Sequence, residues 1–174
     1  FTFAAGCVGH YALSGTTSGT VCDPSQVTIT AHNPLHAGVN PSAGTTLSLN
    51  TSTATGVWGA TVVAGTGTWT PSGLNNGQAT YVFPGTEGSV TLRLNHATAT
   101  TLSVNVLDGS LKNESPAEDP NFVFNAACVA HYALSGTTAG LTCAPSTVVI
   151  TAHNPSHAAV NPAAATSLVL TTST

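Results

Sequence analysis

The feature that most constrains this chain is an internal repeat, in which residues 3–53 recur as residues 124–174. At an offset of 121 positions, 35 of the 51 aligned residues are identical, and Cys7 and Cys22 fall on Cys128 and Cys143. Self-similarity at a fixed period is the signature of a repeated structural unit. The period is too long for a solenoid repeat but is close to the usual size of a whole domain. The sequence therefore predicts one full module followed by the opening part of the next.

Alternation of apolar and polar residues predicts β-strands along the first copy. The segments that alternate are 21–30, 45–50, 79–83, 89–94 and 101–107, and short strands are expected at 57–58 and 68–70. About seven short strands with turn signals every 8–12 residues are typical of an immunoglobulin-like β-sandwich. We therefore predict an all-β fold of immunoglobulin-like β-sandwich modules in tandem, with the second copy incomplete. A small barrel is the alternative architecture.

An acidic, proline-containing segment separates the two copies. Residues 110–120 read SLKNESPAEDP and hold three of the six carboxylates, and the two prolines make such a linker semi-rigid. We predict a complete module at 1–112, a linker at 113–121, and the first part of a second, homologous module at 122–174. On this division Phe122 opens the second module as Phe1 opens the first.

The four cysteines form two pairs, with a separation of 15 residues in each copy. The simplest of the three possible connectivities joins Cys7 to Cys22 and Cys128 to Cys143. Each disulfide would staple two strands across the turn between them. A metal site is the alternative, but the chain has no CxxC spacing. Disulfides imply an oxidising compartment.

Charge is scarce, since charged residues make up 5% of the chain and the only cations are Arg93 and Lys112. A basic footprint for nucleic acid or for an anionic membrane surface is therefore excluded. No apolar run approaches the ~20 residues of a membrane span, so we expect no membrane insertion in this segment. Low net charge also removes the repulsion that keeps proteins apart, which favours association. These properties suit a secreted, assembled protein.

Histidines are the strongest candidate metal ligands. The motif His32-Asn-Pro-Leu-His36 recurs in the second copy with its own histidine pair, and a further histidine in each copy is expected on the adjacent strand. Three imidazoles can bind zinc or copper, but the Asn-Pro pair forbids the helical i,i+4 geometry of zinc enzymes. We predict a polar loop whose histidines bond to the backbone and no bound metal. The alternative metal ligands are His10, His32, His36, His131, His153 and His157.

The carboxylates give little support for other chemistry. Glu114, Glu118 and Asp119, with Asp108, could hold Ca²⁺ between modules, although a solvated hinge and a simple turn at Asp108 account for the same residues. The chain has no G-x-S-x-G nucleophile elbow and few carboxylates for paired acid–base catalysis. We therefore predict that the protein is not an enzyme and has no cofactor.

Several stretches together resemble a known family. They are HYALSGT at 10–16, C-x-P-x-x-V-x-I-x-A-H-N at 22–33, GTWT at 67–70, ATYVFPGTEGSVTLRLNH at 79–96, LSVNVLDG at 102–109 and EDPNFVF at 118–124. This set is similar to the MshQ-like modules of mannose-sensitive haemagglutinin pilus biogenesis proteins and related repetitive bacterial surface proteins. The resemblance implies an extracytoplasmic β-sandwich-type module of pili or cell-surface fibres, and it brings no catalytic residues.

The incomplete second copy leads to a functional hypothesis. Its strands would expose an apolar face that in the first copy is covered by a second sheet, at a cost of ~6–12 kcal/mol as an upper value. Either a longer chain or another copy of this chain must cover it. We predict a homopolymer, a structural block of an extracellular filament or stalk interlocked by strand complementation. The alternative is an adhesin that binds glycans or another cell. The predicted polymerisation interface is Val148, Ile150, Leu168 and Leu170.

Overall fold

The computed structural model describes residues 7–109, 111–112, 119–126, 128–137, 139–140, 143–162 and 166–172. Every regular element in these ranges is a β-strand, so the predicted all-β class is confirmed. None of the described residues forms a helix that is long and apolar enough to cross a membrane.

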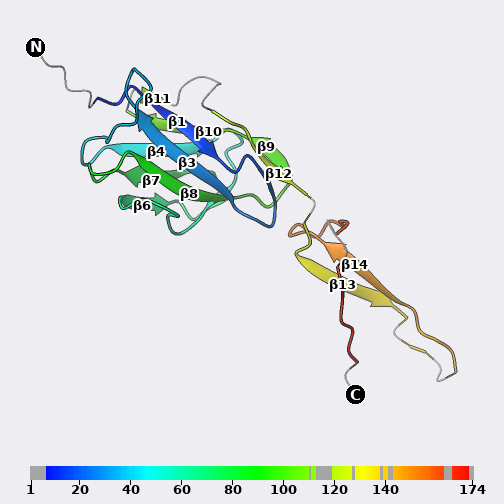
Figure 1. The fold of residues 1–174 in the computed structure, drawn as a ribbon. Coiled ribbons are helices and arrows are strands. Elements are labelled where there is room, and N and C mark those ends of the chain that lie inside the picture. Colours follow the sequence, from blue (N-terminus) through cyan, green and yellow to red (C-terminus); the bar gives the residue numbers. More distant parts are fainter. Residues whose placement is uncertain are drawn as a thin grey trace, which may run out of the picture.

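The strands form two units along the chain, which we call the first unit (residues 7–126) and the second unit (residues 128–172) (Figure 1). The first unit contains β1 (His10–Gly15), β2 (Ser18–Thr20), β3 (Ser25–His32), β4 (Thr46–Thr51), β5 (Val57–Trp58), β6 (Thr68–Pro71), β7 (Ala79–Val82), β8 (Ser89–Asn95), β9 (Thr100–Leu102), β10 (Val104–Asp108), β11 (Leu111–Lys112) and β12 (Phe122–Asn125). The second unit contains β13 (His131–Gly136) and β14 (Val148–His153).

The first unit is a sandwich-like arrangement of sheets. One sheet has the order β1-β3-β8-β5, a second has the order β11-β10-β4-β7-β6, and a third, smaller sheet has the order β2-β12-β9. Along β3 and β4 every second residue is buried, because successive side chains point to opposite faces of a sheet. The inward residues of the sheets form one hydrophobic core, which includes Tyr11, Ile29, Leu47, Tyr81, Phe83, Leu92 and Phe124.

The predicted strand at 101–107 is two strands in the structure. β9 pairs with β12, whereas β10 pairs with β4, so the chain changes partner at Ser103. The Ser103 carbonyl accepts a hydrogen bond from the backbone N–H of Ser52, and the Ser103 N–H donates to the Ser52 hydroxyl. Periodicity runs unbroken through this point because the side chains keep alternating while the backbone partners change.

The boundary between modules differs from the prediction. We expected Phe122 to open the second module, but β12 lies in the first unit, parallel to β2 and antiparallel to β9. Because β11 and β12 both belong to the first unit, the segment 113–121 connects two strands of one unit and does not link two modules. The physical reason is that β12 carries two apolar rings that the first core buries.

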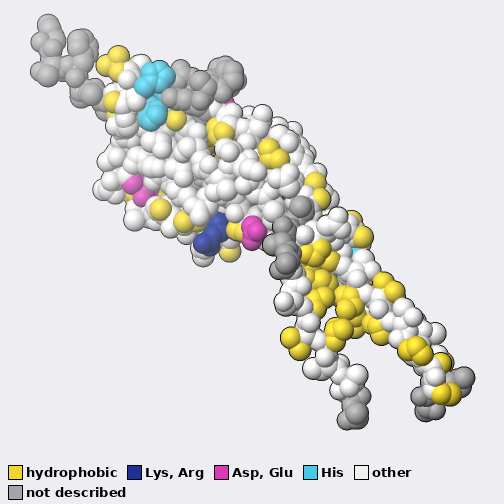
Figure 2. Space-filling view, turned by 45° about the vertical axis from the view of Figure 1, so that its right-hand side comes forward, with side chains coloured by type: hydrophobic (Ala, Val, Ile, Leu, Met, Phe, Trp, Pro, Cys, Tyr) yellow, Lys and Arg dark blue, Asp and Glu magenta, His cyan; other side chains and the backbone are white. Residues whose placement is uncertain are grey.

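The second unit is a two-stranded antiparallel ribbon. β13 and β14 pair in the same register as β1 and β3, with His131 opposite His153 as His10 is opposite His32. The residues aligned with β4, at 167–172, do not form a strand here, and the only described strand partners in this unit are β13 and β14. Figure 2 shows apolar side chains gathered over this unit, whereas the first unit presents a largely polar surface.

Candidate functional site

The junction between the two units begins with β12. By sequence Phe122 and Phe124 align with Phe1 and Phe3, at the start of a repeat, and yet they are 0% and 1% exposed in the core of the preceding unit. Burying two such rings contributes about 2–3 kcal/mol each. The opening strand of one repeat therefore completes the unit before it. Phe1 and Phe3 themselves lie outside the described residues.

A disulfide closes the same junction, and it is not either of the disulfides that we predicted. Cys22 of the first unit is bonded to Cys128, which begins the second unit, with 5.9 Å between their Cα atoms. Cys7 and Cys143 are exposed and free. Since Cys7 aligns with Cys128 and Cys143 with Cys22, each free cysteine is the equivalent of one half of the junction disulfide.

Strand geometry explains why Cys7 does not reach Cys22. In the β1–β3 pair His10 faces His32 and Gly15 faces Val27, so Cys7 precedes one end of the pair and Cys22 precedes the other. The strand pair alone spans about 17 Å at 3.4 Å per residue. A disulfide requires Cα atoms within about 7 Å. The same argument excludes a bond between Cys128 and Cys143.

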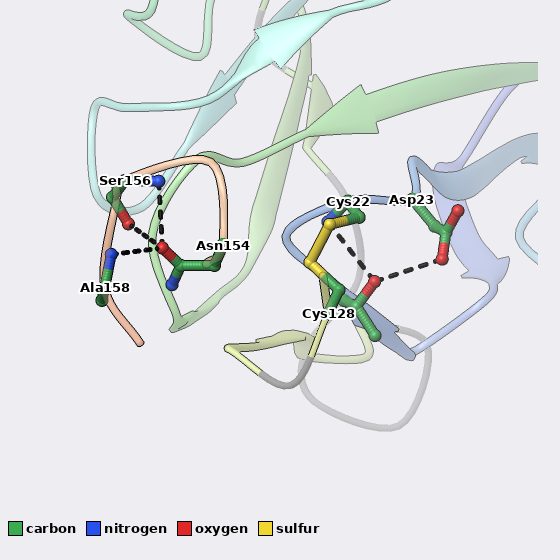
Figure 3. The surroundings of a disulfide bond; sticks show 7 residues. Cys22, Asp23, Cys128, Asn154, Ser156 and Ala158 are labelled. Atoms are coloured by element: carbon green, nitrogen blue, oxygen red, sulfur yellow. Dashed lines mark hydrogen bonds between the residues drawn. A yellow bond between two sulfur atoms is a disulfide. The ribbon is translucent and has the colours of Figure 1, made fainter. Parts of the chain in front are cut away.

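A loop of the second unit lies beside this disulfide (Figure 3). The Asn154 side-chain oxygen accepts hydrogen bonds from the backbone N–H groups of Ser156 and Ala158, both at 3.0 Å, which fixes a compact turn. Pro155 in this turn lines a shallow pocket together with Val21 and His96 of the first unit. Strand β12, the disulfide and this turn thus form one contact region between successive repeats.

The apolar face of the second unit contains all four residues of the predicted polymerisation interface. Val148 is 62% exposed, Leu168 42% and Leu170 66%, and Ile150 is half-buried. Ile150 and Leu168 line one groove with Tyr132. The aligned residues Val27, Ile29, Leu47 and Leu49 are at most 1% exposed in the first unit. The face is therefore the uncovered counterpart of the first unit's core.

The structure brings the six candidate histidines together as two clusters of three. In each cluster the imidazole nitrogens that could bind a metal lie within 4.8 Å of one another. Two members face each other across a strand pair, and the third comes from the turn that follows. We predicted polar loops here, with three converging imidazoles in each copy as the alternative, and the structure brings the three histidines of each copy together. The clusters are His10, His32 and His36, and His131, His153 and His157.

The acidic candidates do not come together among the described residues. Asp108 accepts a hydrogen bond of 2.8 Å from the Tyr11 hydroxyl. Burial, together with this bond, raises the pKa of Tyr11 well above its usual value. Asp108 thus fixes the hydroxyl of a fully buried core tyrosine. Glu114 and Glu118 lie outside the described residues, and Asp119 belongs to neither metal-competent cluster.

The junction residues that sequence reasoning missed are Phe122 and Phe124. The available signal was the alternation Phe122-Val-Phe124, which is typical of a strand with one buried face and which stands four residues before a cysteine in each copy. The comparisons with known proteins add no further residue: no protein-family model matches the chain, and a search of curated proteins found no match. The resemblance to MshQ-like modules therefore stays a prediction.

Proposed function

We propose that this protein is a structural building block of an extracellular bacterial filament, stalk or surface fibre, in which neighbouring units interlock by strand complementation. The observation that carries the proposal is β12, the strand that opens one repeat and fills the core of the unit before it. Main-chain pairing along a sheet edge, with side chains set in a core, is how strand addition joins separate segments firmly.

The disulfide supports the same function. It joins Cys22 to Cys128 across the junction and is compatible with an oxidising, extracellular or secreted setting. The free and exposed Cys7 and Cys143 are the two halves from which the same bond forms with a neighbouring unit on either side. In a series of such units, each junction would hold one strand that opens the following repeat and one covalent bond.

The uncovered face of the second unit indicates what that neighbour supplies. In the first unit the equivalent face is covered by strands from residues 54–125, including β7, β10 and β12. We propose that strands equivalent to these, from a neighbouring module, cover this face in the fibre. The order β1-β3-β8, with β10 beside β4, supports an immunoglobulin-like relationship, since constant-type domains pair strands A, B and E, and C and F, in this way.

The adhesin alternative ranks second because of where the aromatic residues lie. A glycan-binding surface needs exposed rings, but Trp58 is 3% exposed and Tyr81 0%. Trp69 is half-buried, packs edge-to-face on Trp58 with 5.9 Å between ring centroids, and donates its indole N–H to the Gly59 carbonyl. These rings serve the core, which favours a scaffold.

Electron microscopy and analytical ultracentrifugation of residues 1–174, produced under oxidising conditions, test the proposal. We expect concentration-dependent assembly into filaments. Replacing Leu168 and Leu170 together by Ser should weaken the assembly strongly, because both belong to the uncovered apolar face. Val169→Ser is the matched control, because its equivalent in β4 is Ser48, on the opposite face of the strand.

A second variant separates this polymer from other kinds of association. In it a further copy of residues 54–125 follows Thr174, which supplies the missing strands within the same chain. The extended chain should be a more stable monomer, because its own strands now cover the face. Dispersed monomers of residues 1–174 at every concentration, or filaments that persist unchanged in the extended chain, would contradict interlocking through this face.

A further inference from the structure

The two histidine clusters have the same geometry although only one belongs to a complete sandwich. In the first cluster the ring centroids of His10 and His36 lie 4.7 Å apart and those of His10 and His32 5.2 Å apart. In the second cluster the corresponding distances are 4.7 Å and 5.3 Å. The arrangement is therefore encoded in the strand pair and the turn after it, and it recurs with every repeat.

The turn places the third histidine of each cluster by a specific set of bonds. The Asn33 side-chain oxygen accepts from the N–H groups of Leu35 and Ala37, at 2.9 and 3.0 Å, and Asn154 makes the equivalent bonds in the second unit. His36 and His157 then adopt left-handed backbone conformations, with φ of 58° and 60°. Few residues other than glycine adopt this conformation. Both copies use it to turn an imidazole toward the other two.

From this geometry we propose that each cluster binds one divalent transition-metal ion that favours imidazole ligands, such as Zn²⁺ or Cu²⁺. Three histidines and one open position form a known ligand set for zinc. Nitrogens bound to zinc at about 2.0 Å in a tetrahedron lie about 3.3 Å apart. Rotation of the rings closes the difference from the 4.8 Å limit seen here. In the second cluster Nδ1 of His153 is buried and makes no hydrogen bond with a described group.

The burial of the three residues is graded, which gives an ion a way in. In the first cluster one histidine is buried, one half-buried and one exposed, and Figure 2 shows this cluster as an open patch at one end of the first unit. His36 lies on the solvent side, while His10 is 8% exposed. An ion entering past His36 reaches ligands held by the strand pair.

The position of the second cluster gives the metal a structural role at the junction. His131 begins β13, three residues after the disulfide at Cys128. His153 and His157 flank the turn whose Pro155 lines a pocket with Val21 and His96 of the first unit. The Ala130 N–H donates a 2.8 Å hydrogen bond to the His153 carbonyl. One ion would therefore tie the chain that leaves the disulfide to the turn that lies beside the preceding unit, and would stiffen the junction.

Calorimetric titration of the full chain with Zn²⁺ alone tests the assignment. Cys7 and Cys143 are first replaced by Ser, because exposed thiols also bind zinc. We expect two sites per chain, one for each cluster. His36→Asn and His157→Asn should each remove one site, and the double variant both. Asn is suited to these positions because it tolerates the left-handed conformation. Leu35→Ser, which gives the first turn the residue found at Ser156, should leave both sites intact.

Hydrogen exchange of the Ala130 amide, measured with and without Zn²⁺, tests the junction role. We expect exchange to slow at least tenfold in the metal-bound chain and to show no such change in His157→Asn. Absence of saturable heat, or an unchanged stoichiometry in the double variant, would overturn the metal sites. Two sites without slower exchange would overturn the role at the junction.

Discussion

Residues 7–53 and 128–174 have nearly the same sequence but different surroundings, and the difference separates local from tertiary effects. Leu13 is 5% exposed and its equivalent Leu134 is 68% exposed, while Leu49 and Leu170 are 1% and 66% exposed. The burial of these side chains therefore depends on residues 54–125, which cover only the first copy in this structure. Sequence identity alone does not place a leucine in a core.

What the two copies share is local in sequence. The β1–β3 register recurs in β13–β14, the turn bonds of Asn33 recur at Asn154, and the histidine clusters superpose in their ring distances. Each of these features is made by residues within one strand pair and its turn. By contrast, residues 46–51 form β4 only because β7 and β10 flank them. The strand pair is thus the part that each repeat specifies for itself.

The strongest test of this division is Phe124, which belongs to the second copy by sequence and to the first unit by structure. Phe124→Ala should destabilise the first unit by about 3–5 kcal/mol, because it leaves a cavity in a core where the ring is 1% exposed. Denaturant unfolding can be followed by tryptophan fluorescence, since both tryptophans of the chain, Trp58 and Trp69, lie in the first unit. An unchanged unfolding midpoint would mean that β12 does not complete this core in solution.

Equivalent leucines should respond unequally. Leu49→Ala should cost the first unit about 2–5 kcal/mol, whereas Leu170→Ala should change its stability by less than about 0.5 kcal/mol. The same fluorescence measurement, made on monomeric protein at low concentration, checks both. If Leu170→Ala proved as costly as Leu49→Ala, the second copy would be covered in solution and the contrast between the copies would fail.

The junction disulfide gives a smaller difference between equivalent cysteines. Cys22→Ser should lower the free energy of unfolding of the first unit by about 2–4 kcal/mol, because the bond closes a loop of 106 residues that contains most of that unit. Cys143→Ser should have no effect on the first unit, since Cys143 is free. Peptide mapping without reduction provides the direct check, and a Cys7–Cys22 peptide would refute the assignment.

The strands were predictable from sequence because alternation reports which side of a strand is buried. The expected segments at 45–50, 79–83 and 89–94 correspond to β4, β7 and β8 to within a residue or two. The module boundary was not predictable from the repeat, because a repeat has no natural starting point: β12 opens the copy in sequence and closes the preceding unit in space. Alignment of the copies cannot show which neighbour a strand pairs with.

The side-chain contacts of the junction were likewise not predictable from the sequence without the strand register. Cys7 and Cys22 are close in sequence, and their incompatibility follows only once the register of β1 and β3 is known. The histidine clusters needed two facts that the motif does not contain, the pairing of His10 with His32 and the left-handed turn at His36. The exposed face at Val148 and Leu168 was predictable, because it follows from the alignment with buried positions alone.

The smallest expected effect concerns a network found in the segment that only the first unit contains. Glu87 accepts hydrogen bonds from the Tyr81 hydroxyl, from Thr66 and from the Gly67 N–H. Partial burial opposes ionisation of Glu87, but these bonds outweigh it and lower its pKa below the usual value. Burial and the bond to Glu87 raise the pKa of Tyr81 to about 12.

The two shifts act at opposite ends of the pH scale. A lowered folded-state pKa means that the stability from Glu87 is present near neutral pH and is lost as pH falls through that pKa. For Tyr81 the folded-state pKa is raised from 10.0 to about 12, so stability declines as pH rises across that window. Glu87→Gln should cost about 1 kcal/mol or less near pH 7, because the group is only partly buried, and progressively less as pH falls below the usual pKa of a glutamate. Unfolding midpoints from tryptophan fluorescence between pH 3 and 11 measure this, and a cost independent of pH would show that Glu87 acts through its shape and not through its charge.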